Sequence, residues 1–289
     1  MDTEFEAHTM SFRTILANLN ETSNNAAVMA TAAVLAREFD AVVAGLYVVP
    51  ATRSYPSAYY EPIPEMFEVH RKHFDHQTQS VRAAFDAVFA SSSVRSDLLI
   101  ENSPSPLICE SVTERARVCD LVLVSQTETT SELGVELDFV PRVAIAAGRP
   151  VMVVPLESPL RSLPETVAIG WNGSREAARA VFDSLPILKR VKTAYVICVD
   201  PPGERRQAQS PPGEELVRSL KLHGVKAQAS LLSTDGEDLG DVLLRKAMDL
   251  GAGLLVIGAY GHSRLSEFIL GGVTRTVLRR MRCPVLISH

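Results

Sequence analysis

Glycines and a threonine between Leu254 and Thr274 have the spacing best suited to chemistry in this chain. They fall in two turns, formed by Gly258, Gly261 and His262 in the first and by Gly271, Gly272, Val273 and Thr274 in the second. Glycine lets the backbone approach a ligand closely, and the unpaired N–H groups at a helix start attract anions. This stretch therefore predicts a phosphate cradle built from two turns.

The same glycines have a structural interpretation, because glycine also marks ordinary strand-to-helix turns and helix caps. Neither familiar nucleotide fingerprint occurs in the chain. There is no G-x-x-x-x-G-K-[ST] loop, and Gly251-Ala252-Gly253 precedes its strand and lacks a third glycine. Spacing alone leaves both interpretations open.

Length and composition indicate a globular protein that is long enough for two domains. The chain has 289 residues, of which 46% are hydrophobic and 22% charged. No apolar run approaches the roughly 18 residues that a membrane span needs. The N-terminal segment MDTEFEAHTM is acidic, unlike a secretory signal. We therefore expect no membrane association and a cytoplasmic location.

The net charge of -5 is unevenly distributed. Residues 1–155 carry 11 Lys and Arg against 20 Asp and Glu, whereas residues 156–289 carry 18 against 14. This distribution argues against a nucleic-acid binder and favours a small anionic ligand in the second half. The four cysteines have no ligand-like spacing, so we expect reduced core thiols.

The chain contains two copies of one strand–helix pattern. Arg13 to Leu35 and Thr166 to Leu188 each contain an apolar strand, a polar turn and an alanine-containing helical run. Further alternating strands and helices follow in each copy, ending in a strand after Pro150 or Pro284. Such alternation predicts parallel sheets with helices on both faces. We predict domains at 12–155 and 165–289, joined by a linker at 156–164.

Two further expectations concern edges and histidines. The final strand of each copy can pair with its counterpart, which would protect both edges. A long helix is predicted from Glu65 to Ala90, and His70, His73 and His76 recur along it. These histidines are either solvated side chains or ligands of a zinc ion.

The chain resembles the universal stress protein family, specifically its tandem two-domain, UspA-like members. The family motif is G-x2-G-x9-G followed by Ser or Thr. Here it has Gly258, Gly261 and Gly271, with Gly272 at the hydroxyl position. The resemblance implies two open, mostly parallel α/β domains, similar to adenine nucleotide alpha hydrolases and Rossmann folds, packed as a pseudo-dimer.

What the resemblance implies for function is ATP binding, with or without Mg²⁺, in the second domain. Asn172 lies where the family has an acidic residue for base and ribose, and the backbone of Val199 lies where the family contacts adenine. The phosphates would meet Gly258, Gly261, His262, Gly271, Gly272, Val273 and Thr274. Asparagine can accept from a ribose hydroxyl but carries no charge.

The first copy has lost the glycine pattern. Its aligned positions hold Ser125, Glu128, Asp138 and Phe139, of which two are carboxylates and one is a bulky ring. We therefore expect no phosphate site of this kind in the first half, which would have a structural or regulatory role.

The leading hypothesis is a stress-response ATP-binding protein whose nucleotide biases assembly, as a homodimer, or contacts with an unidentified protein. No general base is evident beside the glycines, so any ATPase activity should be slow. A scaffold that binds no nucleotide is the alternative. An adenylylating ATP pyrophosphatase is a third hypothesis, but Trp171-Asn172-Gly173-Ser174 does not match the loop of that group.

Overall fold

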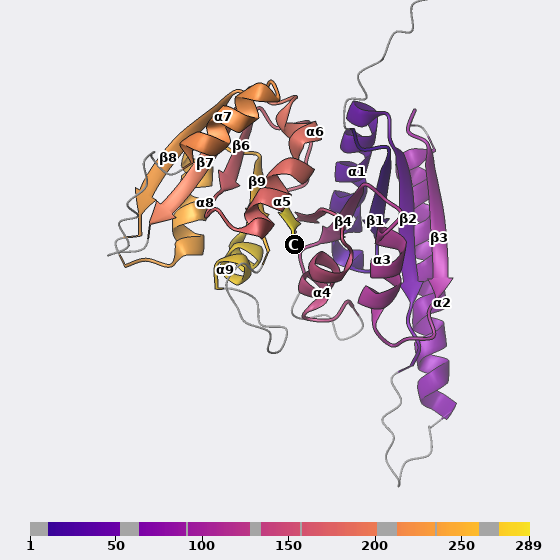
Figure 1. The fold of residues 1–289 in the computed structure, drawn as a ribbon. Helices are drawn as coiled ribbons and strands as arrows, with labels where there is room; N and C mark the ends of the chain where they lie inside the picture. The colour runs from indigo at the N-terminus through magenta and orange to yellow at the C-terminus, as the bar shows by residue number, and fades with distance from the viewer. Residues whose placement is uncertain are drawn as a thin grey trace, which may run out of the picture.

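The computed structural model describes residues 11–52, 64–90, 92–127, 134–156, 158–200, 213–234, 236–259 and 272–289. In these residues strands and helices alternate twice (Figure 1). The elements of the first half are β1 (Thr14–Asn18), the short 3-10 helix η1 (Thr22–Asn24), α1 (Asn25–Phe39), β2 (Val42–Val49), α2 (Pro64–Phe89), β3 (Ser96–Asn102), α3 (Ile108–Ala116), β4 (Leu121–Ser125), α4 (Phe139–Ala146) and β5 (Val151–Val154).

The second half repeats this order with one additional short helix. Its elements are β6 (Thr166–Gly170), α5 (Arg175–Asp183), α6 (Leu185–Leu188), β7 (Thr193–Asp200), α7 (Glu214–Leu222), β8 (Ala227–Ser233), α8 (Leu239–Asp249), β9 (Leu254–Gly258), α9 (Gly272–Arg280) and β10 (Val285–Ser288). The prediction of two mostly parallel α/β units is confirmed.

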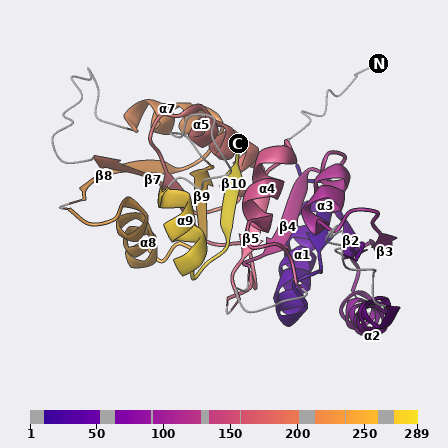
Figure 2. The same ribbon diagram turned by 90° about the horizontal axis from the view of Figure 1, so that it is seen from below.

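One sheet runs through both halves, with strand order β3-β2-β1-β4-β5-β10-β9-β6-β7-β8 among the described strands. Every neighbouring pair is parallel except β5 and β10, which are antiparallel and pair Met152 with Leu286. Figure 2 shows β5 and β10 side by side where the halves meet, with α2 and β8 at opposite ends. The predicted pairing of the two final strands is therefore confirmed.

Within each half, the strand order places the topological switch between the first and fourth strands, which are β1 and β4 or β6 and β9. Connections leave these two strands toward opposite sides of the sheet, so the loops at their carboxyl ends separate. In open α/β sheets, ligands bind in this crevice. The fold therefore contains two equivalent candidate locations, one in each half.

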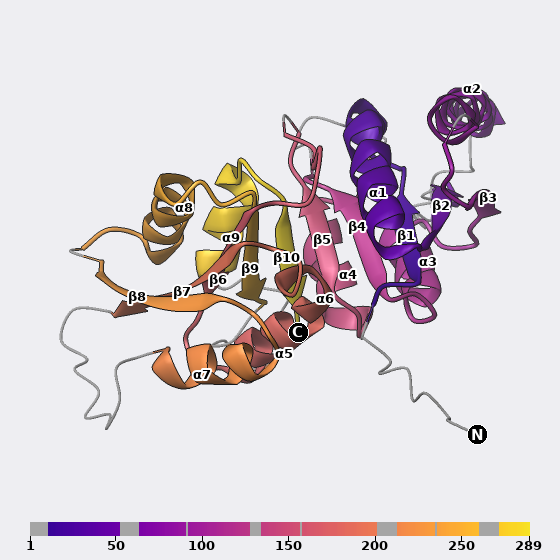
Figure 3. The ribbon, with the colours of Figure 1, turned by 90° about the horizontal axis from the view of Figure 1, so that it is seen from above.

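The sheet is covered on both faces by cores that extend across both halves. One core receives side chains from α1, α2, α5, α6 and α7, and the other from α3, α4, α8 and α9. Figure 3 shows these helices arranged along the whole sheet. Strands such as β4, β5 and β10 are buried at every position, as expected of parallel strands covered on both faces.

The helix expected before Leu188 is divided in two. Helix α5 ends at Asp183 and α6 begins at Leu185, with Ser184 fully buried between them. Pro186 explains the break, because proline has no N–H and its ring clashes with the carbonyl of the preceding turn. The hydroxyl of Ser184 donates to the carbonyl of Val181, so this buried polar group is satisfied within the same helical turn.

The long predicted helix is confirmed as α2, but its histidines contact an aromatic ring. The rings of His70 and His73 lie 4.5 and 5.1 Å from the ring of Phe74, which is buried against the sheet. Burial and the neighbouring His73 lower the pKa of His70, while a backbone contact at Pro50 opposes that shift. Among the described residues, no group of three His, Cys, Asp or Glu side chains could hold a metal.

None of the helices in the described ranges has the length and apolar character required to cross a membrane.

The four cysteines form no disulfide bonds and lie in or near the core, and their burial predicts an alkaline loss of stability. Burial, and then the charge of Glu136, raises the pKa of Cys109 to about 12, and burial raises the pKa of Cys283 to about 11. Unfolding frees both thiols to ionise near pH 9, so stability should fall as the pH rises from about 9 toward these values. Urea titrations at pH 8, 9 and 10 in reductant should show this fall. Cys109→Ala should reduce the fall, and an unchanged pH dependence in that variant would contradict the assignment to this thiol.

Candidate functional site at the carboxyl edge of the second half

The crevice of the second half lies between β6 and β9, and two helices begin beside it. Helix α5 follows β6 after a four-residue turn, and α9 follows the connection from β9. Both helix starts carry the partial positive charge of unpaired N–H groups. Of the predicted site residues, Gly261, His262 and Gly271 lie outside the described residues.

The start of α9 is open at Gly272. Gly272 is the first residue of the helix and is exposed, and no heavy atom of the described residues lies within 4 Å of the position that a Cβ would occupy. Val273 is half-buried and Thr274 is 4% exposed. The first turn therefore offers its backbone at Gly272, whereas the Thr274 side chain is packed inside.

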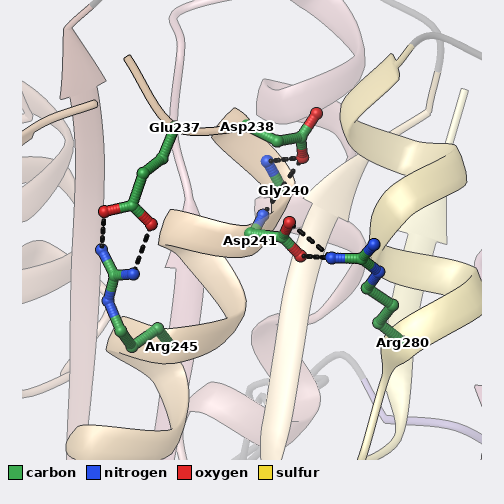
Figure 4. A network of polar contacts seen from close by, with 6 residues as sticks. All are labelled: Glu237, Asp238, Gly240, Asp241, Arg245 and Arg280. Atoms are coloured by element: carbon green, nitrogen blue, oxygen red, sulfur yellow. Dashed lines mark hydrogen bonds and ion pairs between the residues drawn. The ribbon is translucent and has the colours of Figure 1, made fainter. Parts of the chain in front are cut away.

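The position of α9 is determined by contacts with α8 (Figure 4). Arg280 Nη1 lies 2.7 and 2.6 Å from the two carboxylate oxygens of Asp241. At Gly240 the two helices approach so closely that a Cβ would lie 2.7 Å from Thr276 Cβ. Asp238 caps α8 by accepting from the N–H groups of Gly240 and Asp241. These contacts hold α9 against α8 without using its N-terminal turn.

The first half also holds α9, through Gln126. Its Nε2 donates to the carbonyls of Leu278 (2.8 Å) and Arg279 (3.3 Å) at the C-terminal end of that helix. Its Oε1 accepts from the N–H of Leu156 (3.3 Å) in the connection between the halves. A residue at the carboxyl end of β4 thus positions the candidate anion-binding helix, which no sequence motif indicated.

Gly258 is required by packing. A Cβ at this position would lie 2.3 Å from the backbone nitrogen of Ala177 and 2.5 Å from the carbonyl carbon of Glu176. Real Cβ atoms do not approach backbone atoms this closely. The close contact between the end of β9 and the first turn of α5 therefore accounts for this glycine without any ligand.

Asn172 lies in the turn that leads from β6 into α5. Its Oδ1 accepts from the N–H of Ser174 (3.0 Å), and Ser174 in turn caps α5 by accepting from Ala177 N. Gly173, with φ of 74°, adopts the left-handed conformation that this turn requires. Asn172 is exposed, and its oxygen keeps a second lone pair for another donor.

The backbone N–H and C=O groups of Val199 point toward the β6 side of β7. Ile197, two residues earlier, accepts a hydrogen bond from Trp171 N on that side. Because the hydrogen-bonding direction alternates from residue to residue along a strand, Ile197 and Val199 point the same way. Val199 is therefore directed toward the turn at Asn172, beyond the last residue pair of β6 and β7. Within the described part of the chain, no hydrogen bond engages its N–H or C=O in that direction.

Glu176 is a buried carboxylate at this edge. The sequence indicates only an ordinary acidic residue in the first turn of a helix, so its burial could not be predicted. It is 7% exposed and accepts from Arg175 Nη2 at 3.0 Å. Burial acts to raise its pKa, but hydrogen bonds from its own backbone, from Arg175 and from Ser174 outweigh burial and lower the pKa. It therefore remains ionised and paired beside Gly258.

The equivalent edge of the first half is filled by side chains. Ser125 ends β4 as Gly258 ends β9, and its hydroxyl accepts from Asn24 Nδ2 (2.9 Å). Phe139, 1% exposed, is the first residue of α4, as Gly272 is of α9. Asp138 pairs with Arg142 at 2.6 Å, and Glu136 accepts from the N–H of Ile108 at the start of α3. Glu128 lies outside the described residues.

Residues 165–289 match the family model described as "Universal stress protein family". The second half belongs to the universal stress protein family. A 67-residue stretch is 36% identical to universal stress protein Slr1230 from Synechocystis, a match that covers 23% of this chain and only 22% of that protein.

Solved structures show the same architecture over both halves. A universal stress protein from Archaeoglobus fulgidus matches with a TM-score of 0.72 and 14% identity, covering 97% of this chain and 98% of its own. A functionally unknown protein from Pseudomonas aeruginosa matches with a TM-score of 0.59 and 16% identity, over 96% and 92% of the two chains. At these identities the likeness concerns the fold, and it extends the universal stress protein fold to the first half.

Proposed function

We propose that this tandem universal stress protein is a cytoplasmic stress-response protein whose second half binds ATP, with or without Mg²⁺. The bound nucleotide biases the assembly of a homodimer or the contacts with a partner protein. The domains are taken as 12–155 and 165–289. In this proposal the base lies against the backbone of Val199, the ribose lies by Asn172, and the phosphates lie at Gly258, Gly261, His262, Gly271, Gly272, Val273 and Thr274.

The observation that carries the proposal is the arrangement at the switch point. Strands β7 and β9 flank β6, so the Val199 backbone and the open start of α9 lie on either side of one crevice. An adenine edge offers a donor and an acceptor that match the C=O and N–H of a single residue such as Val199, and a helix start favours phosphate. The positive balance of residues 156–289 adds a favourable field for an anion.

Two of the predicted residues have limited roles in this proposal. Gly258 is explained by packing against α5, so it provides close approach but is not evidence for phosphate. Thr274 is buried, so its backbone N–H is the group assigned to the ligand. Hydrolysis is expected to be slow, since an attacking water needs an orienting base and Glu176 is already paired with Arg175.

Gly272→Glu tests the phosphate contact without disturbing the fold. The position is exposed and open, and a carboxylate at a helix start stabilises the helix. Beside a phosphate, however, the carboxylate should weaken ATP binding at least about tenfold, or ~1.4 kcal/mol, relative to the isosteric Gly272→Gln. Calorimetric titration of the full chain with ATP measures both variants, and equal affinities would refute the phosphate assignment.

The alternative is a scaffold of the same fold that binds no nucleotide. Asn172 and Gly272 favour it, because they replace the carboxylate and the hydroxyl that the family uses. Absence of ATP binding by the unmodified chain, and of nucleotide released from protein purified from its host, would support this alternative.

A further inference from the structure

In the first half, the side chain of Asn20 forms two hydrogen bonds with the backbone of Val48. Its Nδ2 donates to the carbonyl of Val48 at 2.7 Å, and its Oδ1 accepts from the N–H of Val48 at 3.0 Å. The side chain is 6% exposed. A planar carboxamide edge therefore satisfies both backbone polar groups of one residue, Val48, at the carboxyl end of β2.

The strand registers show which residues of the second half are equivalent. Thr14 pairs with Val42 as Thr166 pairs with Thr193, and the same offsets relate Val48 to Val199 and Asn20 to Asn172. Both halves thus have asparagine at this position. In the second half, however, Asn172 is exposed and forms a local turn with Ser174, which leaves Val199 without this partner.

The residue two positions earlier explains the difference. In the first half Asn18, 1% exposed, donates from Nδ2 to Asn20 Oδ1 at 2.8 Å and accepts from Asn20 N at 3.4 Å. Its counterpart is Gly170, which has no side chain to anchor Asn172. A side chain there would also lie 2.9 Å from Leu243 Cδ2. Asn18 therefore holds the Asn20 carboxamide against Val48, whereas Gly170 offers no such anchor and Asn172 bonds to Ser174 instead.

We propose that the first half contains a binding site for the hydrogen-bonding edge of a planar molecule. The site is closed because the Asn20 carboxamide occupies the place of the ligand. The ligand class is a small planar molecule with a hydrogen-bond donor next to an acceptor, such as a primary amide or an aminopyrimidine edge. Phe139 and Asp138 occupy the phosphate side, so the site fits an uncharged ring without phosphates. This site is independent of nucleotide binding by the second half.

Chemical complementation of Asn20→Gly tests the proposal. The substitution removes a group with the shape of acetamide and leaves the Val48 groups unpaired, so the melting temperature should fall by several degrees. Acetamide at about 1 M should restore about 2 °C relative to its effect on the unmodified chain. N,N-dimethylacetamide, which has no N–H donor, should not. Adenine should act like acetamide at lower concentration.

Control variants separate this site from the second half. Asn172→Gly removes the equivalent exposed side chain and should gain nothing from acetamide. If Asn20→Gly does not fold, Asn18→Ala releases the anchor while keeping Asn20, and calorimetry should then detect an adenine site absent from the unmodified chain. Adenine binding by the unmodified chain would be assigned to the second half, where Val199 has no such partner in the described part of the chain. The proposal would be overturned if acetamide did not selectively raise the melting temperature of Asn20→Gly and Asn18→Ala gained no adenine binding, whatever the second half binds.

Discussion

Gly258→Ala should destabilise the protein by about 3 kcal/mol or more, the upper range for overpacking a core. The added methyl group would lie 2.3 Å from Ala177 N and 2.5 Å from the Glu176 carbonyl carbon. Both are backbone atoms of α5, so no side-chain rotation relieves the clash, and α5 must move away from β9. Guanidinium or thermal unfolding monitored by circular dichroism measures the loss, which would be a large part of a typical domain stability of about 5–15 kcal/mol.

Gly272→Ala is the matched control, because the same methyl group there meets no atom within 4 Å among the residues that the structure describes. It should leave the unfolding midpoint unchanged or slightly raised, since alanine favours helix more than glycine. This comparison also affects how binding data are interpreted. Loss of ATP binding in Gly258→Ala would follow from displacement of α5, whereas loss in Gly272→Glu alone would indicate a phosphate contact. Equal stabilities of the two alanine variants would contradict the packing role of Gly258.

Leu286→Asp should abolish the cooperative fold of both halves. Leu286 is fully buried on β10 and pairs with Met152, also fully buried, on β5 of the other half. A carboxylate there has no partner and is shielded from water, so we expect a cost above about 4 kcal/mol. Because one sheet spans the chain, both halves should lose structure in a single transition. Size-exclusion chromatography and unfolding curves of the full chain measure this.

Leu222→Asp makes the same chemical change at a residue that is 90% exposed. It should cost less than about 1 kcal/mol, since the carboxylate stays hydrated and opposes the helix dipole only at the end of α7. A Leu286→Asp protein that keeps its first half folded, with a separate second transition, would show that β5 and β10 do not couple the halves.

The duplicated architecture was predictable from local pattern. Buried parallel strands need continuous apolar runs, and the segments around Leu121 and Leu254 provide them before amphipathic helices. Proline before each final strand also predicted the pairing of β5 and β10, because two unprotected edges are stabilised by pairing. The strands and helices depend on neighbours in sequence, and the pairing of β5 with β10 follows from the repetition of the same edge strand in both copies.

Gly258 shows where sequence pattern was insufficient. The glycine spacing suggested phosphate, but the contact that requires this glycine comes from α5, about eighty residues earlier in the chain. Gln126, which caps α9 from the first half, is equally invisible in sequence, since it acts on carbonyls more than 150 positions away. Contacts between distant segments depend on how the elements pack, and composition does not encode them locally.

The two asparagines separate the contributions of sequence and tertiary structure most clearly. The family resemblance predicts a nucleotide contact at Asn172, and the same residue type stands at Asn20 in the other copy. Tertiary structure alone distinguishes them: Asn20 is buried on the backbone of Val48, and Asn172 faces solvent. The physical reason is the anchor, because Asn18 holds one carboxamide by a hydrogen bond and Gly170 cannot hold the other.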